Sequence, residues 1–442
     1  MGPIYGIELG HLAPRVLNIN QGDVTNKMTM DAEANPMNEF DVLANESIQN
    51  PFEFAARLRQ EAPVYWNERY SFWMISRHDD VKEALRMPTQ LSSRHRAPLE
   101  RRRDRLPLSA QKNFDIGIDF LYGHLQASDP PIHTDQRQQL MKAFAPLVPG
   151  IVKTSLERRV HRLLDSFESA GSCDFVKDVA HPLSSGVIFD LLGVPVEHHQ
   201  IIFEVAKLFM VFPHAAYTQD CEALEGIAET AMGAREALGA LVKSRHTMPG
   251  EDLISALVHA DGSSQVMSDD EIVQLCTFLL VAGHETTANL MSGSLRYLLE
   301  DRKQWEQLLV NPTILPGAIE ELLRFVSPVL WVGRFTTEDV RVSGQTIPKG
   351  HGVMLGLGSA NHDPDAFEDP EVLDLTRKNV RSLAFGHGVH SCVGAAVTSM
   401  ETQMVLAELL KRMPNVQLKT REFEYAPVYF VRSLKSLPIS IR

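Results

Sequence analysis

The stretch FGHGVHSCVG, Phe385–Gly394, brings three glycines, two histidines and one cysteine together in ten residues. A helical pattern of apolar residues follows from Ala395 and stops at Pro414, so Cys392 lies just ahead of a predicted helix N-terminus. Glycine permits positive φ and lets a backbone approach a large flat partner. The amides and the positive end of the helix favour a thiolate at Cys392. An unpaired cysteine in such an electropositive loop is typical of a metal ligand or a nucleophile.

A lone cysteine is most often a small buried hydrophobe, but the residues around Cys392 outweigh that interpretation. The pattern Phe-Gly-x-Gly-x-His-x-Cys-x-Gly closely resembles the haem-binding loop of the cytochrome P450 family. The resemblance implies that Cys392 is the axial thiolate ligand of the iron in haem b. It also implies that His390 binds a haem propionate and that Phe385 packs beside the sulfur. Gly386 and Gly394 are assigned to the haem site by the same resemblance.

Two other motifs are excluded for this stretch. Ser391 occupies the place of the third glycine in a dinucleotide-binding fingerprint. The sequence contains no Cys-x-x-Cys-His, which excludes a covalently attached c-type haem.

A second unusual stretch lies within a long predicted helix. Ser268–Glu271 is a capping box that predicts a helix start, and the apolar pattern continues towards Leu299 without a proline. Its middle reads AGHETT, 282–287, although glycine and β-branched threonine are unfavourable in a helix interior. A broken local rule in a core helix indicates a functional constraint. A zinc-protease helix is excluded because Ala288 stands where its second histidine belongs.

AGHETT resembles the oxygen-activating motif of cytochromes P450. The resemblance implies that Ala282 contributes to haem binding and that Glu285 and Thr286 face the distal side of the iron. Breaking the O–O bond consumes two protons, which a hydroxyl and a carboxylate can position and relay. Peroxide-driven relatives commonly lack the acid–threonine pair, so its presence favours dioxygen plus two electrons.

Three further residues are implied to bind the haem propionates. His133 and Arg137 are four residues apart on a helix predicted to begin after Pro130 and Pro131, so they share a face. Arg334 stands where the family keeps another propionate-binding arginine. The arginine fork suits a carboxylate well.

A structural network is expected from Glu321, Arg324 and Arg377, which match the family's Glu-x-x-Arg pair and its third member. Two positions depart from the family pattern: His362 replaces an arginine, and Ser382 replaces a frequent histidine. Neither departure touches the iron ligand or the acid–threonine pair.

The substrate pocket is expected to be mostly apolar. By resemblance, a helix over 199–212 and the loop after it cover the pocket. The residues assigned to its lining are Phe209, Phe212, Phe278, Leu279, Val329, Leu330, Val332, Tyr429 and Phe430. Their apolar character favours a largely apolar ligand.

Composition limits the remaining possibilities. The chain has 442 residues, 44% of them hydrophobic, and no linker divides it, so we expect an extension over 1–36 and a single domain over 37–442. The net charge of -13 argues against nucleic-acid binding. Four scattered cysteines indicate a reducing cytoplasm rather than a disulfide framework. The N-terminus has no apolar run that could serve as a membrane anchor.

Periodicity predicts helices over 156–167, 184–192, 199–212 and 221–243, and short strands near 63–66 and 72–75. Residues 425–441 alternate like a hairpin. The arginine-rich segment Arg94–Arg105 is interpreted as a solvated loop, with contact to an acidic substrate or protein as the alternative.

The fold implied is mainly α with a small β-rich region, the cytochrome P450 fold. The function implied is monooxygenation, most simply hydroxylation, of a small organic substrate by a soluble, bacterial-type monomer. The sequence has no flavin fingerprint or iron–sulfur cysteine cluster, so a ferredoxin with its reductase is the expected electron donor. Ring coupling or desaturation remains an alternative, as does a non-catalytic haem-thiolate sensor. Whether the substrate is free or carrier-bound stays open.

Overall fold

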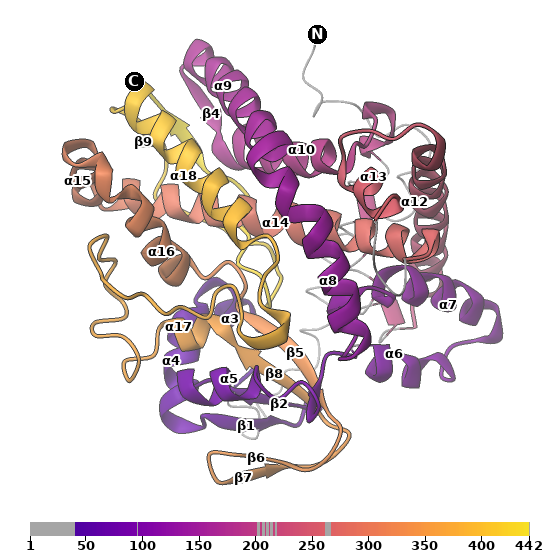
Figure 1. The fold of residues 1–442 in the computed structure, drawn as a ribbon. Coiled ribbons are helices and arrows are strands. Elements are labelled where there is room, and N and C mark those ends of the chain that lie inside the picture. The colour runs from indigo at the N-terminus through magenta and orange to yellow at the C-terminus, as the bar shows by residue number, and fades with distance from the viewer. Residues whose placement is uncertain are drawn as a thin grey trace.

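The computed structural model describes residues 40–94, 96–200, 204–205, 208, 212, 215–216, 219–260 and 267–441. Helices make up most of it (Figure 1). The α-helices are α3 Asn45–Gln49, α4 Pro51–Glu61, α5 His78–Ala84, α6 Arg96–Arg103, α7 Leu108–Tyr122, α8 Ile132–Phe144, α9 Lys153–Ala170, α10 His181–Leu192, α12 Cys221–Thr247, α13 Leu253–Val258, α14 Asp269–Glu300, α15 Arg302–Val310, α16 Leu315–Val326, α17 Leu357–Asn361 and α18 Ala395–Arg412. The strands are β1 Val64–Asn67, β2 Phe72–Ile75, β3 Leu91–Ser92, β4 Ser172–Asp174, β5 Trp331–Thr336, β6 Val340–Val342, β7 Gln345–Ile347, β8 Gly352–Gly356, β9 Gln417–Leu418 and β10 Pro438–Ser440.

The longest helix, α14, crosses the middle of the molecule and contacts α10, α12, α16 and α18 (Figure 1). Its start is the predicted capping box: the Ser268 hydroxyl accepts from the Glu271 amide, and the Glu271 carboxylate accepts from the Ser268 amide. Packing against α10 explains one unusual residue, because a Cβ at Gly283 would lie 2.6 Å from the Ile188 side chain. Glycine therefore lets the two helices approach closely.

Helical periodicity gave a good account of this region. The helices predicted near 156–167, 184–192 and 221–243 are confirmed as α9, α10 and α12. Together with α14, α16 and α18, they surround a large apolar core in which Leu164, Leu192 and Leu295 have no exposed surface. Most of the helix predicted over 199–212 lies outside the described residues.

A five-stranded sheet in the order β1-β2-β8-β5-β3 lies at one end of the molecule, at the bottom of Figure 1. The predicted hairpin is confirmed, with Val64 opposite Ile75 in the antiparallel β1–β2 pair. β2 continues the sheet by pairing in parallel with β8. The sheet positions β5, which carries Arg334.

The C-terminal hairpin prediction is only partly right. A bridge joins Tyr425 to Leu434. The following strand, β10, instead pairs with β9 and β4 in a separate three-stranded sheet. The segment is thereby held against α14, where Ser433 reaches Glu285 near the middle of the helix.

The segment Arg94–Arg105 was predicted to be a solvated loop, but residues 96–103 form the helix α6. Two of its arginines, which remain partly exposed, pair with acidic residues of the neighbouring α7. Arg103 makes a two-pronged contact with Asp115, at 2.6 and 2.7 Å, and Arg96 contacts Asp119. These two aspartates lie on a separate helix, so the arginine run itself did not reveal them, whereas Arg96 also pairs with Glu100 of α6 at 3.0 Å.

Across the part of the chain that the structure describes, no helix combines the length and apolar character needed to cross a bilayer.

Candidate functional site

Cys392 lies in the loop predicted for it, between a short 3-10 turn at Gly388–His390 and the start of α18. Its amide donates to the Phe385 carbonyl at 2.9 Å, which closes the loop. Gly386 and Gly388 have φ of 69° and 75°, in the left-handed region that favours glycine. A Cβ at Gly388 would also lie 2.6 Å from the Leu85 carbonyl oxygen.

The surroundings of the Cys392 sulfur shift the pKa of the thiol in two opposing directions. Cys392 is exposed by its accessible surface, but atoms crowded around the sulfur raise the pKa of the thiol by desolvation. The amides of Gly394 and Ala395 and the charge of Arg137 act in the opposite sense, as expected at a helix N-terminus. Burial outweighs them in the protein alone. A metal cation at the sulfur reverses this balance, because a coordinating thiol is deprotonated.

Four of the residues assigned to propionates lie together beside this loop. The rings of His133 and His390 are 4.0 Å apart, centre to centre. The Arg137 guanidinium donates to the Ser391 hydroxyl at 3.3 Å. Arg137 and Arg334 both lie close enough to lower the pKa of His133, which burial as the main cause brings to about 4. Burial also lowers the pKa of Arg334 to about 10.

The donor set fits haem b. His133 is 1% exposed, yet neither of its ring nitrogens has a hydrogen-bond partner within the protein. A buried donor left unsatisfied is costly, and a carboxylate beside His133 would satisfy it. Two arginines and two histidines suit the pair of propionates on a porphyrin. The thiolate-forming cysteine, one turn before α18, suits its iron.

The AGHETT stretch forms part of an unbroken α14. Phe278, Ala282 and Thr286 recur every four residues, so they share one face of the helix, and all three are half-buried. The Thr286 hydroxyl donates to the Ala282 carbonyl at 2.9 Å within the helix. The second threonine, Thr287, instead contacts the Thr398 hydroxyl of α18 at 3.0 Å. The two threonines thus have different surroundings.

Glu285 lies among groups from three segments of the chain. Its Oε1 accepts from the Ser433 hydroxyl at 2.7 Å. Its Oε2 lies 3.9 Å from His181 Nδ1 and 3.9 Å from His284 Nε2. Sequence reasoning missed His181 and Ser433, which are remote from Glu285 in the chain. The adjacent histidine in His284-Glu285 was the only local signal.

The residues assigned to the substrate pocket differ in their burial. Phe209 lies outside the described residues, whereas Phe212 has no exposed surface and packs with Phe114, 5.3 Å between ring centres. Phe278 stacks on His124 at 4.6 Å. Leu330 is buried in the core beside the sheet. The half-buried members are Phe278, Leu279, Val329, Val332, Tyr429 and Phe430.

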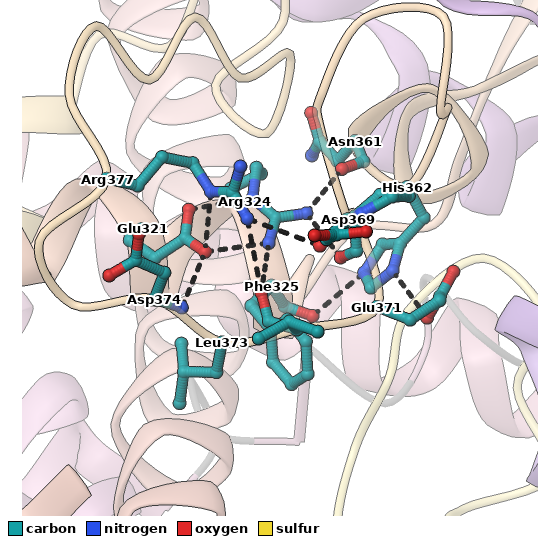
Figure 2. Close-up of polar contacts among 12 residues, drawn as sticks. Glu321, Arg324, Phe325, Asn361, His362, Asp369, Glu371, Leu373, Asp374 and Arg377 are labelled. Atoms are coloured by element: carbon teal, nitrogen blue, oxygen red, sulfur yellow. Dashed lines mark hydrogen bonds and ion pairs between the residues drawn. The ribbon is translucent and has the colours of Figure 1, made fainter.

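The residues assigned to a structural network, Glu321, Arg324 and Arg377, lie together (Figure 2). The Glu321 carboxylate accepts from Arg324 of the same helix and, at 3.1 Å, from Arg377. The Arg324 guanidinium also donates to the carbonyl of Asn361 at 2.8 Å, and the Asn361 side chain accepts from the Leu383 amide at 2.7 Å. This chain of bonds connects α16 to the segment that leads into the cysteine loop.

His362, one of the departures from the family pattern, adds a second connection. Its ring nitrogens contact the Phe325 carbonyl at 3.1 Å and the Glu371 carboxylate at 3.0 Å (Figure 2). The ring stacks on Phe52 at 3.9 Å. Burial favours a higher pKa at Glu371, but the contact with His362 overcomes it, so the pKa of Glu371 is lowered.

Comparison with known proteins agrees with this geometry. Residues 306–422 match the family model described as Cytochrome P450. The chain is 31% identical to the polyketide biosynthesis cytochrome P450 PksS of Bacillus subtilis (strain 168), over 89% of this chain and 96% of that protein.

Solved structures give the same result. P450BioI, in complex with an acyl carrier protein ligated to hexadec-9Z-enoic acid, has a TM-score of 0.79 at 30% identity, covering 90% of this chain and 100% of that one. CYP109E1 from Bacillus megaterium, in complex with testosterone, has a TM-score of 0.75 at 30% identity, covering 89% and 99%. The chain therefore belongs to the cytochrome P450 family, whose members bind haem b through a cysteine thiolate and act as monooxygenases on small substrates with electrons from a redox partner.

Proposed function

We propose that this cytochrome P450 hydroxylates a small, largely apolar organic substrate, with Cys392 as its iron ligand. In this reaction one oxygen atom of dioxygen enters a C–H bond and the other leaves as water. Two electrons and two protons are consumed. Bound haem supplies the iron at which dioxygen is activated.

The observation that carries the assignment of the haem site is the group of side chains beside Cys392. His133, Arg137, Arg334 and His390 come from three separate parts of the chain and lie together next to the cysteine loop. The half-buried guanidiniums of Arg137 and Arg334 and the unsatisfied ring nitrogens of His133 call for an anionic partner. In this assignment these residues hold the propionates, while Phe385, Gly386 and Gly394 shape the loop around the sulfur.

Thr286 and Glu285 are assigned to the delivery of protons to the reacting oxygen. Thr286 lies on the half-buried α14 face that also carries Ala282 and Phe278, so its hydroxyl can leave the Ala282 carbonyl to hold a water or the reacting oxygen. Glu285 is the neighbouring carboxylate, held by Ser433 at one oxygen. A carboxylate and a hydroxyl in sequence can pass a proton inward.

An apolar substrate is supported by the residues that remain half-buried. Phe278, Leu279, Val332 and Tyr429 are all apolar or aromatic and lie on α14, β5 and the C-terminal segment. Two relatives with solved structures hold testosterone and a hexadec-9Z-enoic acid carried by an acyl carrier protein. A ligand screen by haem spin-state shift therefore begins with steroids and fatty acids, the latter free and carrier-bound.

We infer that a ferredoxin-type protein and its reductase supply the electrons. We also infer that the enzyme is a cytoplasmic monomer. The basic residues nearest the cysteine loop support docking there. Arg86 is exposed and donates to His387 at 2.8 Å, and Lys82 lies close enough to lower the pKa of His387 further, after burial and Arg86. Arg86→Glu should slow reduction by the ferredoxin, and added salt should slow it in the unaltered protein. Lys349→Glu, on the exposed turn before β8, is the matched control.

The first test is the absorption spectrum of the reduced protein under carbon monoxide. We expect a strongly red-shifted Soret band that Cys392→Ala abolishes and Cys221→Ala, at another exposed cysteine, leaves unchanged. A histidine-type band in the unaltered protein contradicts the assignment of Cys392.

The second test separates the two threonines. Thr286→Ala should divert electrons to hydrogen peroxide, whereas Thr287→Ala, which removes the contact with Thr398, should keep oxygen use coupled to product. Equal uncoupling in both variants contradicts a specific role of Thr286.

A further inference from the structure

The structure brings together three potential metal ligands, His181, His284 and Glu285, of which the proposed function uses only Glu285. One ligand-type atom from each residue lies within 4.8 Å of the other two. His181 begins α10, and the other two residues are adjacent on α14. The α10–α14 packing that requires Gly283 therefore also brings these three side chains together.

The orientation of each group suits a cation. His284 Nδ1 lies 2.7 Å from the Leu280 carbonyl, which can only accept, so Nδ1 carries the proton and Nε2 presents its lone pair. His181 Nδ1 is buried and has no hydrogen-bond partner in the protein. Glu285 Oε2 lies 3.9 Å from each of these two nitrogens.

The surrounding contacts resemble the outer shell of a metal site. A metal-binding histidine usually donates its other ring N–H to a carbonyl or carboxylate, and a metal-binding carboxylate is itself hydrogen-bonded. His284 has the first of these contacts, to Leu280, and Glu285 has the second, from Ser433. The ligating atoms are thus already oriented before any cation binds.

We propose that His181, His284 and Glu285 form a zinc site beside the oxygen-activating segment. Two imidazoles and one carboxylate are a common zinc donor set, with the fourth position left to water. Zinc–ligand lengths of about 2.0–2.2 Å place tetrahedral ligand atoms roughly 3.3 Å apart. The present separations, 3.9 Å from Glu285 to each histidine nitrogen and within 4.8 Å among all three ligand atoms, must shorten by side-chain rotation when zinc binds.

Zinc at this site withdraws the Glu285 carboxylate from proton transfer. Its effect on turnover rests on the role proposed for Glu285, whereas binding of the metal does not. Changes in available zinc would then act on the enzyme as reversible inhibition, relieved by a chelator.

Binding is measured on the haem-loaded enzyme by equilibrium dialysis against buffered zinc, with zinc and iron quantified together. We expect a saturable zinc per iron in the unaltered protein. His181→Asn and Glu285→Gln should each weaken it at least about 100-fold, since loss of outer-shell partners alone costs about 10–100-fold. His246→Asn is the matched control, because His246 of α12 forms an exposed pair, 2.9 Å apart, with Asp269 at the start of α14, sixteen residues before Glu285. Zinc binding that survives His181→Asn overturns the site.

X-ray absorption at the zinc edge identifies the ligands independently of activity and of the haem iron. Nitrogen and oxygen neighbours near 2.0 Å support the site, and a sulfur neighbour at about 2.3 Å, from a cysteine elsewhere, overturns it. Turnover is then compared with and without zinc in the unaltered protein and in His181→Asn. Inhibition confined to the unaltered protein supports both proposals. Binding without inhibition supports the site and contradicts the role of Glu285, whereas absence of binding overturns the site and leaves that role standing.

Discussion

Glu321 and Arg324, three residues apart on α16, form a two-pronged ion pair with N–O distances of 2.8 and 2.7 Å, and neither side chain exposes any surface. An ion pair in such a position gains strength from the low dielectric but has paid for its desolvation. It therefore stabilises the protein only while both partners, and the carbonyls that surround Arg324, are in place (Figure 2).

Removing one partner of this pair should be severe. Arg324→Ala leaves the Glu321 carboxylate buried with its main partner gone, and breaking a buried pair in this way costs about 3–5 kcal/mol. We expect that loss in urea unfolding of the haem-loaded enzyme. Lys153→Ala, in an exposed pair with Glu157, should cost about 0–1 kcal/mol. Similar costs for the two substitutions would contradict the assigned importance of burial.

A pH dependence is expected from Asp190, which connects α10 to α9. Burial favours a higher pKa, but Arg159, at 2.7 Å, and Ser155 overcome it, so the pKa of Asp190 is lowered. A carboxyl with a lowered folded-state pKa stabilises the protein above its unfolded-state pKa of about 3.9, and this stabilisation disappears as the pH falls through the folded-state value.

Asp190→Asn should therefore cost about 1.5–3 kcal/mol at pH 7, the range for hydrogen bonds to charged groups. The difference from the unaltered protein should shrink as the pH is lowered below about 4. The measurement is the free energy of unfolding across this range, and a difference that stays constant with pH would refute the assignment.

Gly388→Ala should damage the cysteine loop. The substitution puts a Cβ 2.6 Å from the Leu85 carbonyl oxygen at a φ of 75°. A strained backbone position costs about 1–3 kcal/mol, and the shift should also reduce the red-shifted carbon monoxide band. Gly150→Ala, where a Cβ meets nothing within 4 Å, provides the comparison. A normal band and melting temperature in Gly388→Ala would show that the loop relaxes freely.

Arg334→Ala should accelerate haem loss. A charge-assisted bond to a carboxylate contributes about 1.5–3 kcal/mol, so transfer of haem to apomyoglobin should become roughly 10–100-fold faster. Arg341→Ala, at an exposed position on the neighbouring strand β6, should transfer haem at the unaltered rate. Identical rates of haem transfer in both variants would show that Arg334 does not contact the haem.

The sequence predicted most accurately what short-range rules decide. The capping box at Ser268 starts α14 because its two reciprocal bonds span only three residues. The positive φ of Gly386 and Gly388 was predictable in the same way, since glycine tolerates this conformation better than other residues.

Contacts between distant segments did not follow from local rules, and only the family resemblance indicated some of them, such as Glu321 with Arg377. Ser433 reaches Glu285 across 148 residues, and His181 reaches it from another helix. The ion pair between Arg103 of α6 and Asp115 of α7 was missed for the same reason.

In the five-stranded sheet, β2 pairs with β8, a strand that is synthesised much later. β1 and β2 leave the ribosome early and can form their hairpin at once, yet β2 takes its second neighbour from β8, with Phe72 opposite Gly352. Until that strand is translated, β2 presents an open hydrogen-bonding edge, and Ile75 lacks the Val353 and Leu355 side chains that it packs against. Open edges of this kind recruit other chains. The nascent polypeptide therefore carries this open edge throughout the translation of its helical middle, and a fragment truncated before β8 should aggregate rather than accumulate.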